Sequence, residues 1–172
     1  GGLARLPANL RGIHKIAIDY PRNQFVYAAT DNGLYRTTDS GANWSLKLPG
    51  YFTDVIVSSG ISDPNAVVLA AARGLGLSRS TNNGNNFGAF TTLGFPAGQV
   101  GRISLTHHNL YPVVNQVYCI AEDAFGGGSM LFIARSQDTG KSWLYTNIPA
   151  GNGPRGDYSN CIMMNPKNPE SL

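Results

Sequence analysis

A short polar stretch at residues 36–44, RTTDSGANW, has the composition of a chemical site. It places the Asp39 carboxylate two residues after the hydroxyl of Thr37 and two residues before Gly41. A carboxylate, a hydroxyl and a glycine at this spacing could hold a metal ion or cradle a phosphate. The same residues could instead close a tight turn, because short hydroxyl and Asx side chains bond nearby backbone N–H groups.

The stretch is one of three copies of a pattern: a hydroxyl residue, then Asp or Asn, then Gly, then an aromatic residue. The pattern residues are Thr37, Asp39, Gly41 and Trp44; Ser80, Asn82, Gly84 and Phe87; and Ser136, Asp138, Gly140 and Trp143. Asn82 keeps the hydrogen-bonding reach of Asp but loses its charge, which a catalytic acid or a metal ligand would tolerate poorly. We therefore predict three structural turns, in which the glycine supplies an unusual backbone conformation and the aromatic residue re-enters a sheet. No metal and no cofactor is expected.

Strand-like segments surround each turn. Three short apolar or alternating segments precede it and one follows, as at residues 15–18, 25–29, 33–36 and 44–48. Four-stranded units of roughly 40–50 residues with a glycine and aromatic signature are typical of β-propeller blades. The predicted fold is all-β, a partial propeller of four-stranded antiparallel blades spanning residues 1–172. Its parts are the outer strand of a preceding blade at 3–7, blades at 12–49, 52–96 and 100–149, and the start of another blade at 158–172.

Three blades do not close a ring, since propellers have roughly four to eight. We predict that the remaining blades come from further chain or from a partner chain. Alternatively, residues 3–6 complete the last blade of a closed ring.

Composition argues against several classes of partner. Lys and Arg are scattered singly, so no basic stripe indicates nucleic acid. The longest apolar run, residues 66–72, is far shorter than the roughly 18 residues of a membrane span. Cys119 and Cys161 belong to no CxxC or Cys/His cluster, so no zinc site is expected; two buried thiols and a disulfide both remain open. His107 and His108 would point to opposite faces of a strand, so they are not expected to share a metal.

Strand direction separates two faces of such a propeller. In an antiparallel blade, the turn between the third and fourth strands lies opposite the hairpin between the second and third. The hairpins, with the connections between blades, carry carboxylates, an arginine and aromatic residues: Asp31, Arg73, Glu122, Asp123, Tyr51, Phe52 and Phe125. Such a surface suits a carbohydrate or a peptide. Asp31-Asn32-Gly33 is also a good hairpin turn in its own right.

The repeated turn resembles the Asp-box, or BNR repeat, and the resemblance runs from about residue 3 to residue 172. This family includes sialidases, sortilin-type receptor domains, xyloglucanase-type glycoside hydrolases and secreted bacterial propellers. The resemblance implies a β-propeller whose boxes are structural and lie away from the active face. Together with the low charge density, it implies an extracellular or cell-surface location.

Two enzyme interpretations follow from the resemblance. Sialidases begin with an Arg-Ile-Pro-like segment, but here Arg102-Ile103 is followed by Ser104. Xyloglucanase-type enzymes carry a catalytic Asp in a segment resembling YARTDIGGAYR, and residues 27–36 read YAATDNGLYR with Asp31 at the matching position. Ala29 replaces the arginine of that segment, and one glycine is missing. A glycosidase also needs a second carboxylate.

We therefore expect a secreted or cell-surface propeller that binds a glycan or a protein through its hairpin face. The predicted binding residues are Tyr51, Phe52, Arg73, Glu122, Asp123 and Phe125. The alternatives are a xyloglucanase-like glycoside hydrolase with Asp31 as a catalytic carboxylate, and a non-catalytic scaffold or assembly factor.

Overall fold

The computed structural model describes residues 6, 10–20, 22–59, 64–96, 98–107, 115–125, 129–147, 162, 163 and 165. Within these ranges the chain forms eleven strands and no helix. No helix long and apolar enough to cross a membrane therefore occurs among these residues. Except for Leu6, Ile162, Met163 and Asn165, the segments predicted at 3–7 and 158–172 lie outside the described residues.

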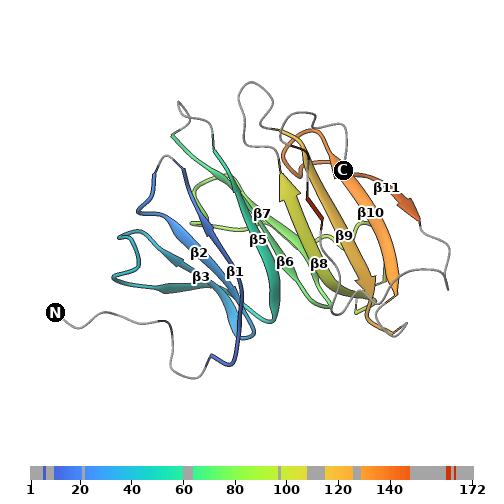
Figure 1. The fold of residues 1–172 in the computed structure, drawn as a ribbon, viewed down its shortest axis with the longest axis horizontal. Coiled ribbons are helices and arrows are strands. Elements are labelled where there is room, and N and C mark those ends of the chain that lie inside the picture. The colour runs from blue at the N-terminus through green and yellow to red at the C-terminus, as the bar shows by residue number, and fades with distance from the viewer. Residues whose placement is uncertain are drawn as a thin grey trace.

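The strands form three antiparallel sheets that stand side by side (Figure 1). Each sheet is one blade, with its strands in sequence order. The first blade contains β1 (Ile13–Ile18), β2 (Val26–Thr30), β3 (Gly33–Thr37) and β4 (Ser45–Pro49). The second contains β5 (Phe52–Ser58), β6 (Val67–Ala72) and β7 (Gly76–Ser80). The third contains β8 (Val100–His107), β9 (Val117–Asp123), β10 (Met130–Ser136) and β11 (Leu144–Asn147).

The second blade differs from the prediction, which placed a fourth strand after Phe87. That segment meets β7 through an isolated bridge, Leu77 to Thr91, with two N–H···O bonds of 2.8 Å, and through one bond of 2.9 Å from the Gly88 N–H to the Arg79 carbonyl. Regular pairing cannot continue, because Leu93 has a φ of 56° and Gly94 a φ of 89°, which turn the chain away. The predicted fourth strand is therefore wrong as a regular element, although its place beside β7 is kept.

Two apolar layers, one at each junction between blades, form the core. Strand β6 illustrates this arrangement, because its side chains point alternately into the one layer and into the other. Val68, Ala70 and Ala72 pack toward the first blade, whereas Leu69 and Ala71 pack toward the third. A single blade cannot bury both of its faces, so packing between neighbours supplies the hydrophobic stabilisation of the fold.

The innermost strands β1, β5 and β8 are neighbours across these junctions (Figure 1). The Thr53 hydroxyl of β5 donates to the Ile103 carbonyl of β8 at 2.9 Å and accepts from the Ile103 N–H at 3.2 Å. Asp54 accepts from the Leu105 N–H at 2.9 Å and lies 3.9 Å from the Lys15 ammonium group of β1. Burial raises the pKa of Asp54, although the Leu105 bond and Lys15 act in the opposite direction. These contacts fix the spacing of the three inner strands.

The three repeated turns share one hydrogen-bond pattern. In the first, the Thr37 hydroxyl donates to Asp39 Oδ1 at 2.7 Å and accepts from the Gly41 N–H at 3.0 Å. Asp39 Oδ1 also accepts from the Asn43 N–H at 2.8 Å. The residue before each glycine is left-handed as well: Ser40, Asn83 and Thr139 each have a φ of 57°. Two consecutive left-handed residues therefore shape each turn, and the side-chain oxygen of Asp39, Asn82 or Asp138 closes it.

Hydrogen bonds also set the acidity of the two turn carboxylates. Bonds from Asn43 and Thr37 lower the pKa of Asp39. Burial opposes the charge of Asp138, but bonds from Ser142, Ser136 and the Lys141 N–H outweigh it and lower the pKa to about 2.

Acid is therefore expected to weaken the third turn. Because the pKa of Asp138 is lower in the folded chain than its ordinary 3.8, the carboxylate stabilises the fold above that pH. This contribution is lost as the pH falls through about 2. Asp138→Asn, which copies Asn82, should remove up to about 1 kcal/mol of stability at neutral pH, since the group lies near the surface. Urea unfolding of both proteins, above pH 3.8 and near pH 2, measures the difference between their free energies of unfolding. Near pH 2 the stability of the variant should approach that of the wild type. A stability difference that is the same at both pH values would contradict the prediction.

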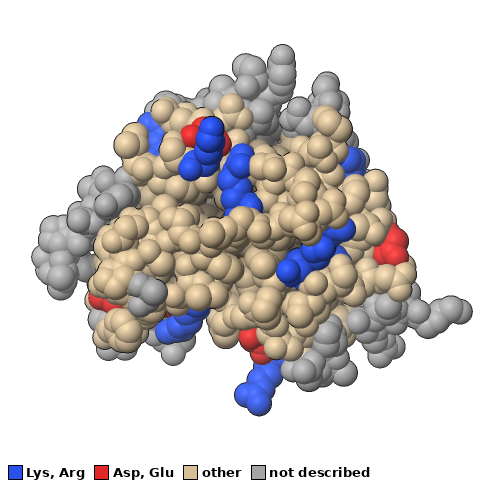
Figure 2. Space-filling model, turned by 180° about the vertical axis from the view of Figure 1, so that it is seen from behind, with Lys and Arg blue, Asp and Glu red and all other residues tan. Residues whose placement is uncertain are grey.

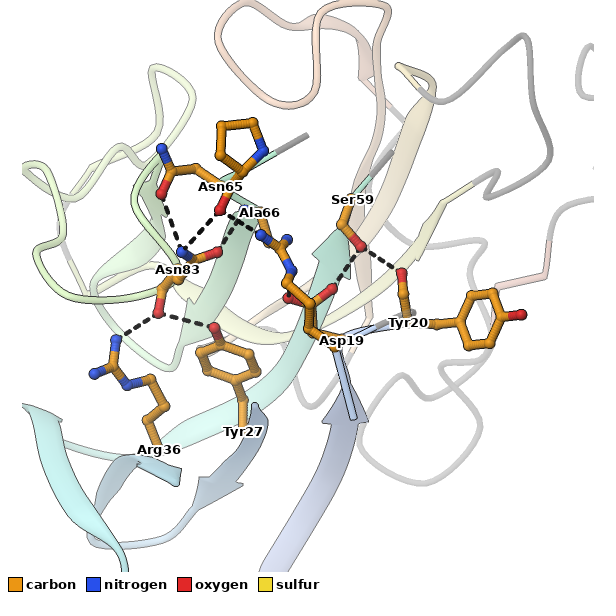
Figure 3. Close-up of polar contacts among 10 residues, drawn as sticks. Asp19, Tyr20, Tyr27, Arg36, Ser59, Asn65, Ala66 and Asn83 are labelled. Carbon is orange, nitrogen blue, oxygen red and sulfur yellow. Dashed lines mark hydrogen bonds and ion pairs between the residues drawn. The ribbon is translucent and has the colours of Figure 1, made fainter. Parts of the chain in front are cut away.

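An arginine near the end of the third strand ties the first blade to the turn of the second, and another ties the second blade to the turn of the third. The carbonyl of Asn83 accepts from the Tyr27 hydroxyl at 2.8 Å and from Arg36 Nη1 at 2.6 Å (Figure 3). At the following junction, Arg79 Nε donates to the Thr139 carbonyl at 2.8 Å. Both acceptors belong to the left-handed residue before the turn glycine. The turns are therefore joints between blades as well as blade corners.

A second polar cluster reinforces the first junction. Asp19, which is buried, forms an ion pair with Arg22 at 3.0 Å and accepts from the Ser59 hydroxyl at 2.6 Å. Arg22 also donates to the Pro64 carbonyl, and Ser59 donates to the carbonyl of Tyr20 at 2.7 Å (Figure 3). Seen from behind, the Lys and Arg side chains lie in separate small groups on a mostly uncharged surface, and some of these groups adjoin Asp or Glu side chains (Figure 2).

Candidate functional site

The hairpins opposite the repeated turns form one surface, here called the loop face. It consists of the β2–β3, β6–β7 and β9–β10 hairpins with the connections that lead into β5 and β8. Backbone bonds join these segments: the Arg73 N–H donates to the Tyr51 carbonyl at 2.9 Å, and the Gly74 N–H donates to the Val100 carbonyl at 2.7 Å. The Ala124 N–H donates to the Gln99 carbonyl at 2.8 Å. The loop face is therefore a connected surface in which hairpins and connections support one another.

A pocket of about 70 Å³ lies on the loop face, where the inner strands of the three blades begin. Its lining side chains are His14, Tyr51, Thr53, Arg73, Arg102 and Glu122. Three of the predicted binding residues, Tyr51, Arg73 and Glu122, thus come together here although they are far apart in sequence.

Glu122 is the most deeply buried charged group of the pocket, with 2% of its surface exposed. Its Oε1 accepts from the Arg102 N–H at 2.6 Å. Its Oε2 is shielded from solvent and has no hydrogen-bond partner among the described residues. Gly101 makes room for the carboxyl group, since a Cβ at that position would lie 2.5 Å from Glu122 Cγ. A buried acceptor without a partner costs about 1–3 kcal/mol, which a bound polar group would recover.

Two further groups of the pocket hold shielded atoms without partners in the described chain, Arg102 Nε and His14 Nε2. The His14 ring lies 4.8 Å from the Tyr51 ring, centroid to centroid, and the rings are tilted by 37°. Burial lowers the pKa of His14, Arg102 lowers it further, and Asp31 opposes both. The imidazole is therefore neutral at pH 7.

Asp31, the predicted catalytic carboxylate, lies at the β2–β3 turn and is not among the side chains that line the pocket. Its Oδ2 accepts from the Arg11 N–H at 3.0 Å, whereas Oδ1 is shielded and lacks a partner in the described structure. Asp31 is close enough to His14 to affect the pKa of that imidazole. It therefore stands beside the pocket, on the side of the first blade.

The remaining predicted residues are placed differently. Phe52 is fully buried in the core between the first two blades, 6.3 Å from the Phe90 ring, so its prediction as a binding residue is wrong. Tyr51 and Phe52 are adjacent in the chain, and only Tyr51, which is 41% exposed, faces outward. Asp123 accepts from the Phe125 N–H at 2.9 Å and so closes the β9–β10 hairpin. Phe125 stands at the tip of that hairpin with 79% of its surface exposed.

Three residues of the pocket were not predicted: His14, Thr53 and Arg102. They share one structural cause, because each lies at a register shift between an inner strand and its neighbour. A β-bulge bends the strand and re-aims a side chain. The three residues stand at equivalent positions near the start of the first strand of each blade, and the pairing of the strands reveals this equivalence. The same local irregularity, repeated in three blades, delivers one side chain from each to the pocket.

No known protein family and no curated protein matches the chain in sequence. Solved structures do match in three dimensions. An ancestral GH74 enzyme is 18% identical with a TM-score of 0.62, and the match covers 90% of this chain and 21% of that one. The GH74 xyloglucanase from Xanthomonas campestris is 17% identical with a TM-score of 0.54, covering 80% and 23%. The GH74 enzyme from Niastella koreensis is 20% identical with a TM-score of 0.54, covering 80% and 21%.

The fold is that of a β-propeller. This likeness and the three antiparallel sheets confirm the predicted fold class, and the chain spans about a fifth of the length of these solved structures.

The described residues contain one cysteine and no cluster of potential metal ligands. Among the described residues, no group of three or more His, Cys, Asp or Glu side chains is placed to hold a metal ion. Cys119 is a buried free thiol, and burial raises its pKa to about 12, so it stays protonated and unreactive at neutral pH. Cys161 lies outside the described residues. The groups that line the pocket can act through hydrogen bonds, through stacking on Tyr51 and through the Glu122 carboxylate.

Proposed function

We propose that this propeller binds a glycan through the loop face, outside the cell or on its surface. The observation that carries the proposal is the pocket in which the shielded atoms Glu122 Oε2 and Arg102 Nε lack partners within the described chain. Sugar hydroxyl groups donate and accept hydrogen bonds at once, so they can satisfy an unpartnered acceptor and an unpartnered donor together.

Exposed aromatic residues support the same proposal. Tyr51 borders the pocket and Phe125 projects from the neighbouring hairpin, where a sugar ring could stack on either. The GH74 enzymes that share the fold include one named a xyloglucanase, which is the reason to test plant polysaccharide fragments first.

Tyr51→Ala tests the proposal directly. Loss of the aromatic surface should weaken the affinity for a bound oligosaccharide by roughly tenfold or more, as truncation of an interface tyrosine commonly does. The measurement is a glycan array followed by calorimetric titration. The matched control is Tyr20→Ala, since Tyr20 is a 72% exposed tyrosine in the turn at the opposite end of the blade. Equal losses in the two variants, or no glycan bound by the wild type, would contradict the proposal.

Hydrolysis is the second candidate function, because two carboxylates with unpartnered oxygens, Asp31 and Glu122, lie on the loop face. Glycosidases use such a pair as acid and as base or nucleophile. Release of shorter sugars by the wild type, abolished in Asp31→Asn, would establish this activity. Binding without release identifies a non-catalytic glycan-binding propeller, and neither binding nor release leaves a scaffold or assembly role.

The remaining blades of the ring are part of the proposal. The outward side of the first blade leaves Ile13, Ile16 and Ile18 about half exposed. A further blade packed there would bury them as the second blade buries Tyr27 and Leu34. This blade can come from the same polypeptide or from a partner chain.

A further inference from the structure

We infer that the pocket holds one uncharged, hydroxyl-bearing group of the glycan between Arg102 and Glu122, so that the loop face selects neutral over acidic sugars. The group is a hydroxymethyl or a pair of neighbouring hydroxyls. This inference rests on the proposed glycan-binding function and names the ligand class of that same site.

The size of the pocket limits what it can enclose. Pockets that surround a drug-sized ligand have roughly 300–1,000 Å³, whereas this one has about 70 Å³. It therefore encloses only a small part of a sugar. The rest of the ligand lies across the loop face, beside Tyr51.

The hydrogen-bonding atoms of the pocket decide the chemistry of that part. Glu122 Oε2 needs a donor, and Arg102 Nε needs an acceptor. A hydroxyl group supplies both, because it carries one O–H donor and two acceptor lone pairs. A carboxylate or sulfate group supplies acceptors only, so it would leave Glu122 Oε2 unpartnered and would press negative charge against it.

The charges around the pocket lead to the same selection. Arg73 and Arg102 contribute two positive charges to the lining, and Glu122 contributes one negative charge. Asp31 stands beside the pocket with a second carboxylate, and His14 is neutral at pH 7 because its pKa is lowered by burial and by Arg102. The four charged groups balance, so an acidic sugar gains no net attraction. Among the charged groups, Glu122 is the most buried, so its repulsion of an anion is the least screened by water.

Hydrogen bonds within the chain fix the side chains of the pocket in the positions that binding requires. Thr53 donates to the Ile103 carbonyl and accepts from the Ile103 N–H, so it fixes β5 against β8 and its O–H donor is already used. The Arg102 N–H holds Glu122 Oε1, which leaves Oε2 as the acceptor for the ligand. Gly101 provides the space that the carboxyl group occupies. Arg102 is therefore placed to use its backbone to hold Glu122 and its side chain to bind the ligand.

The test compares matched sugars that differ in a single group. The probes are β-glucan, mannan and galactan oligosaccharides and their C6-oxidised counterparts, in which a carboxylate replaces the hydroxymethyl group. The wild type should bind a neutral probe at least about tenfold more tightly than its oxidised form, as expected for a buried carboxylate facing a ligand anion. Calorimetric titration measures both affinities at one ionic strength.

Glu122→Gln is the matched variant, because it keeps the shape of the side chain and removes the charge. It should weaken binding of the neutral probe and reduce the preference over the oxidised probe to within about threefold. Thermal unfolding checks that the variant folds; should it not fold, the wild-type comparison of the two probes still decides. Equal binding, or tighter binding of the oxidised probe, overturns this inference but leaves glycan binding intact. No binding of any probe overturns both.

Discussion

Replacing Gly101 by alanine is expected to weaken glycan binding by roughly a hundredfold while leaving the propeller folded. A Cβ at this position would lie 2.5 Å from Glu122 Cγ and 2.7 Å from Glu122 Oε1, so the carboxyl group must move out of its place. Gly101 has no positive φ, so alanine causes no backbone strain of its own. A displacement of about 1 Å at a functional group can cost roughly a hundredfold in function, and we expect a loss of affinity of that size.

The cost to stability should be smaller than the loss of function. Overpacking a buried site costs about 1–3 kcal/mol, and the displaced end of Glu122 can turn toward the pocket. Gly88→Ala is the matched control: Gly88 also lacks a positive φ, and its Cβ would lie no closer than 3.6 Å to any atom, the Arg79 carbonyl oxygen. Gly88 stands beside β7 and does not line the pocket. Retained affinity in Gly101→Ala, measured by titration, would show that Glu122 does not position the ligand.

The repeat predicted which face of the blade each loop would occupy, and this is why Tyr51, Arg73 and Glu122 could be grouped from the sequence. Turn residues recur at a fixed spacing and strands alternate in direction, so the face follows from counting. Whether one side chain at the edge of a strand points in or out does not follow in the same way. Tyr51 and Phe52 are both aromatic, and only the packing against Phe90 decides that Phe52 is the buried one.

The three pocket residues that were not predicted show a stricter limit on what can be inferred from the sequence. His14, Thr53 and Arg102 reach the pocket because each inner strand slips its register against its neighbour at that point. A bulge is a property of a strand pair, so no pattern within one strand reveals it. Similarly, glycine marked the left-handed position in each turn, but Ser40, Asn83 and Thr139 are left-handed too, held by hydrogen bonds from their own N–H groups to Gln24, Ala66 and Asn115.

Gly84→Ala is expected to lower the free energy of unfolding by about 3 kcal/mol, because two separate costs add. The first is the backbone, since Gly84 has a φ of 67° and a left-handed residue with a Cβ costs about 1–2 kcal/mol. The second is contact, since the new Cβ would lie 2.7 Å from Tyr27 Cε1. Tyr27 is fully buried and donates its hydroxyl to the Asn83 carbonyl, so it cannot move without opening the junction between the first two blades.

The matched control for this variant is Gly41→Ala, which separates the two costs. Gly41 occupies the same place in the first turn and has a φ of 94°, farther from the left-handed well than the 67° of Gly84, so alanine there has a backbone cost at least as large. Its Cβ would meet nothing closer than Trp44 Nε1 at 3.9 Å, so the contact cost is absent. Urea unfolding should therefore show a loss of about 1–2 kcal/mol for Gly41→Ala. Equal losses in the two variants would mean that close packing of the Gly84 turn against the neighbouring blade contributes nothing to stability. A larger loss in Gly84→Ala would show that the glycine is needed for blades to pack together as well as to turn the chain.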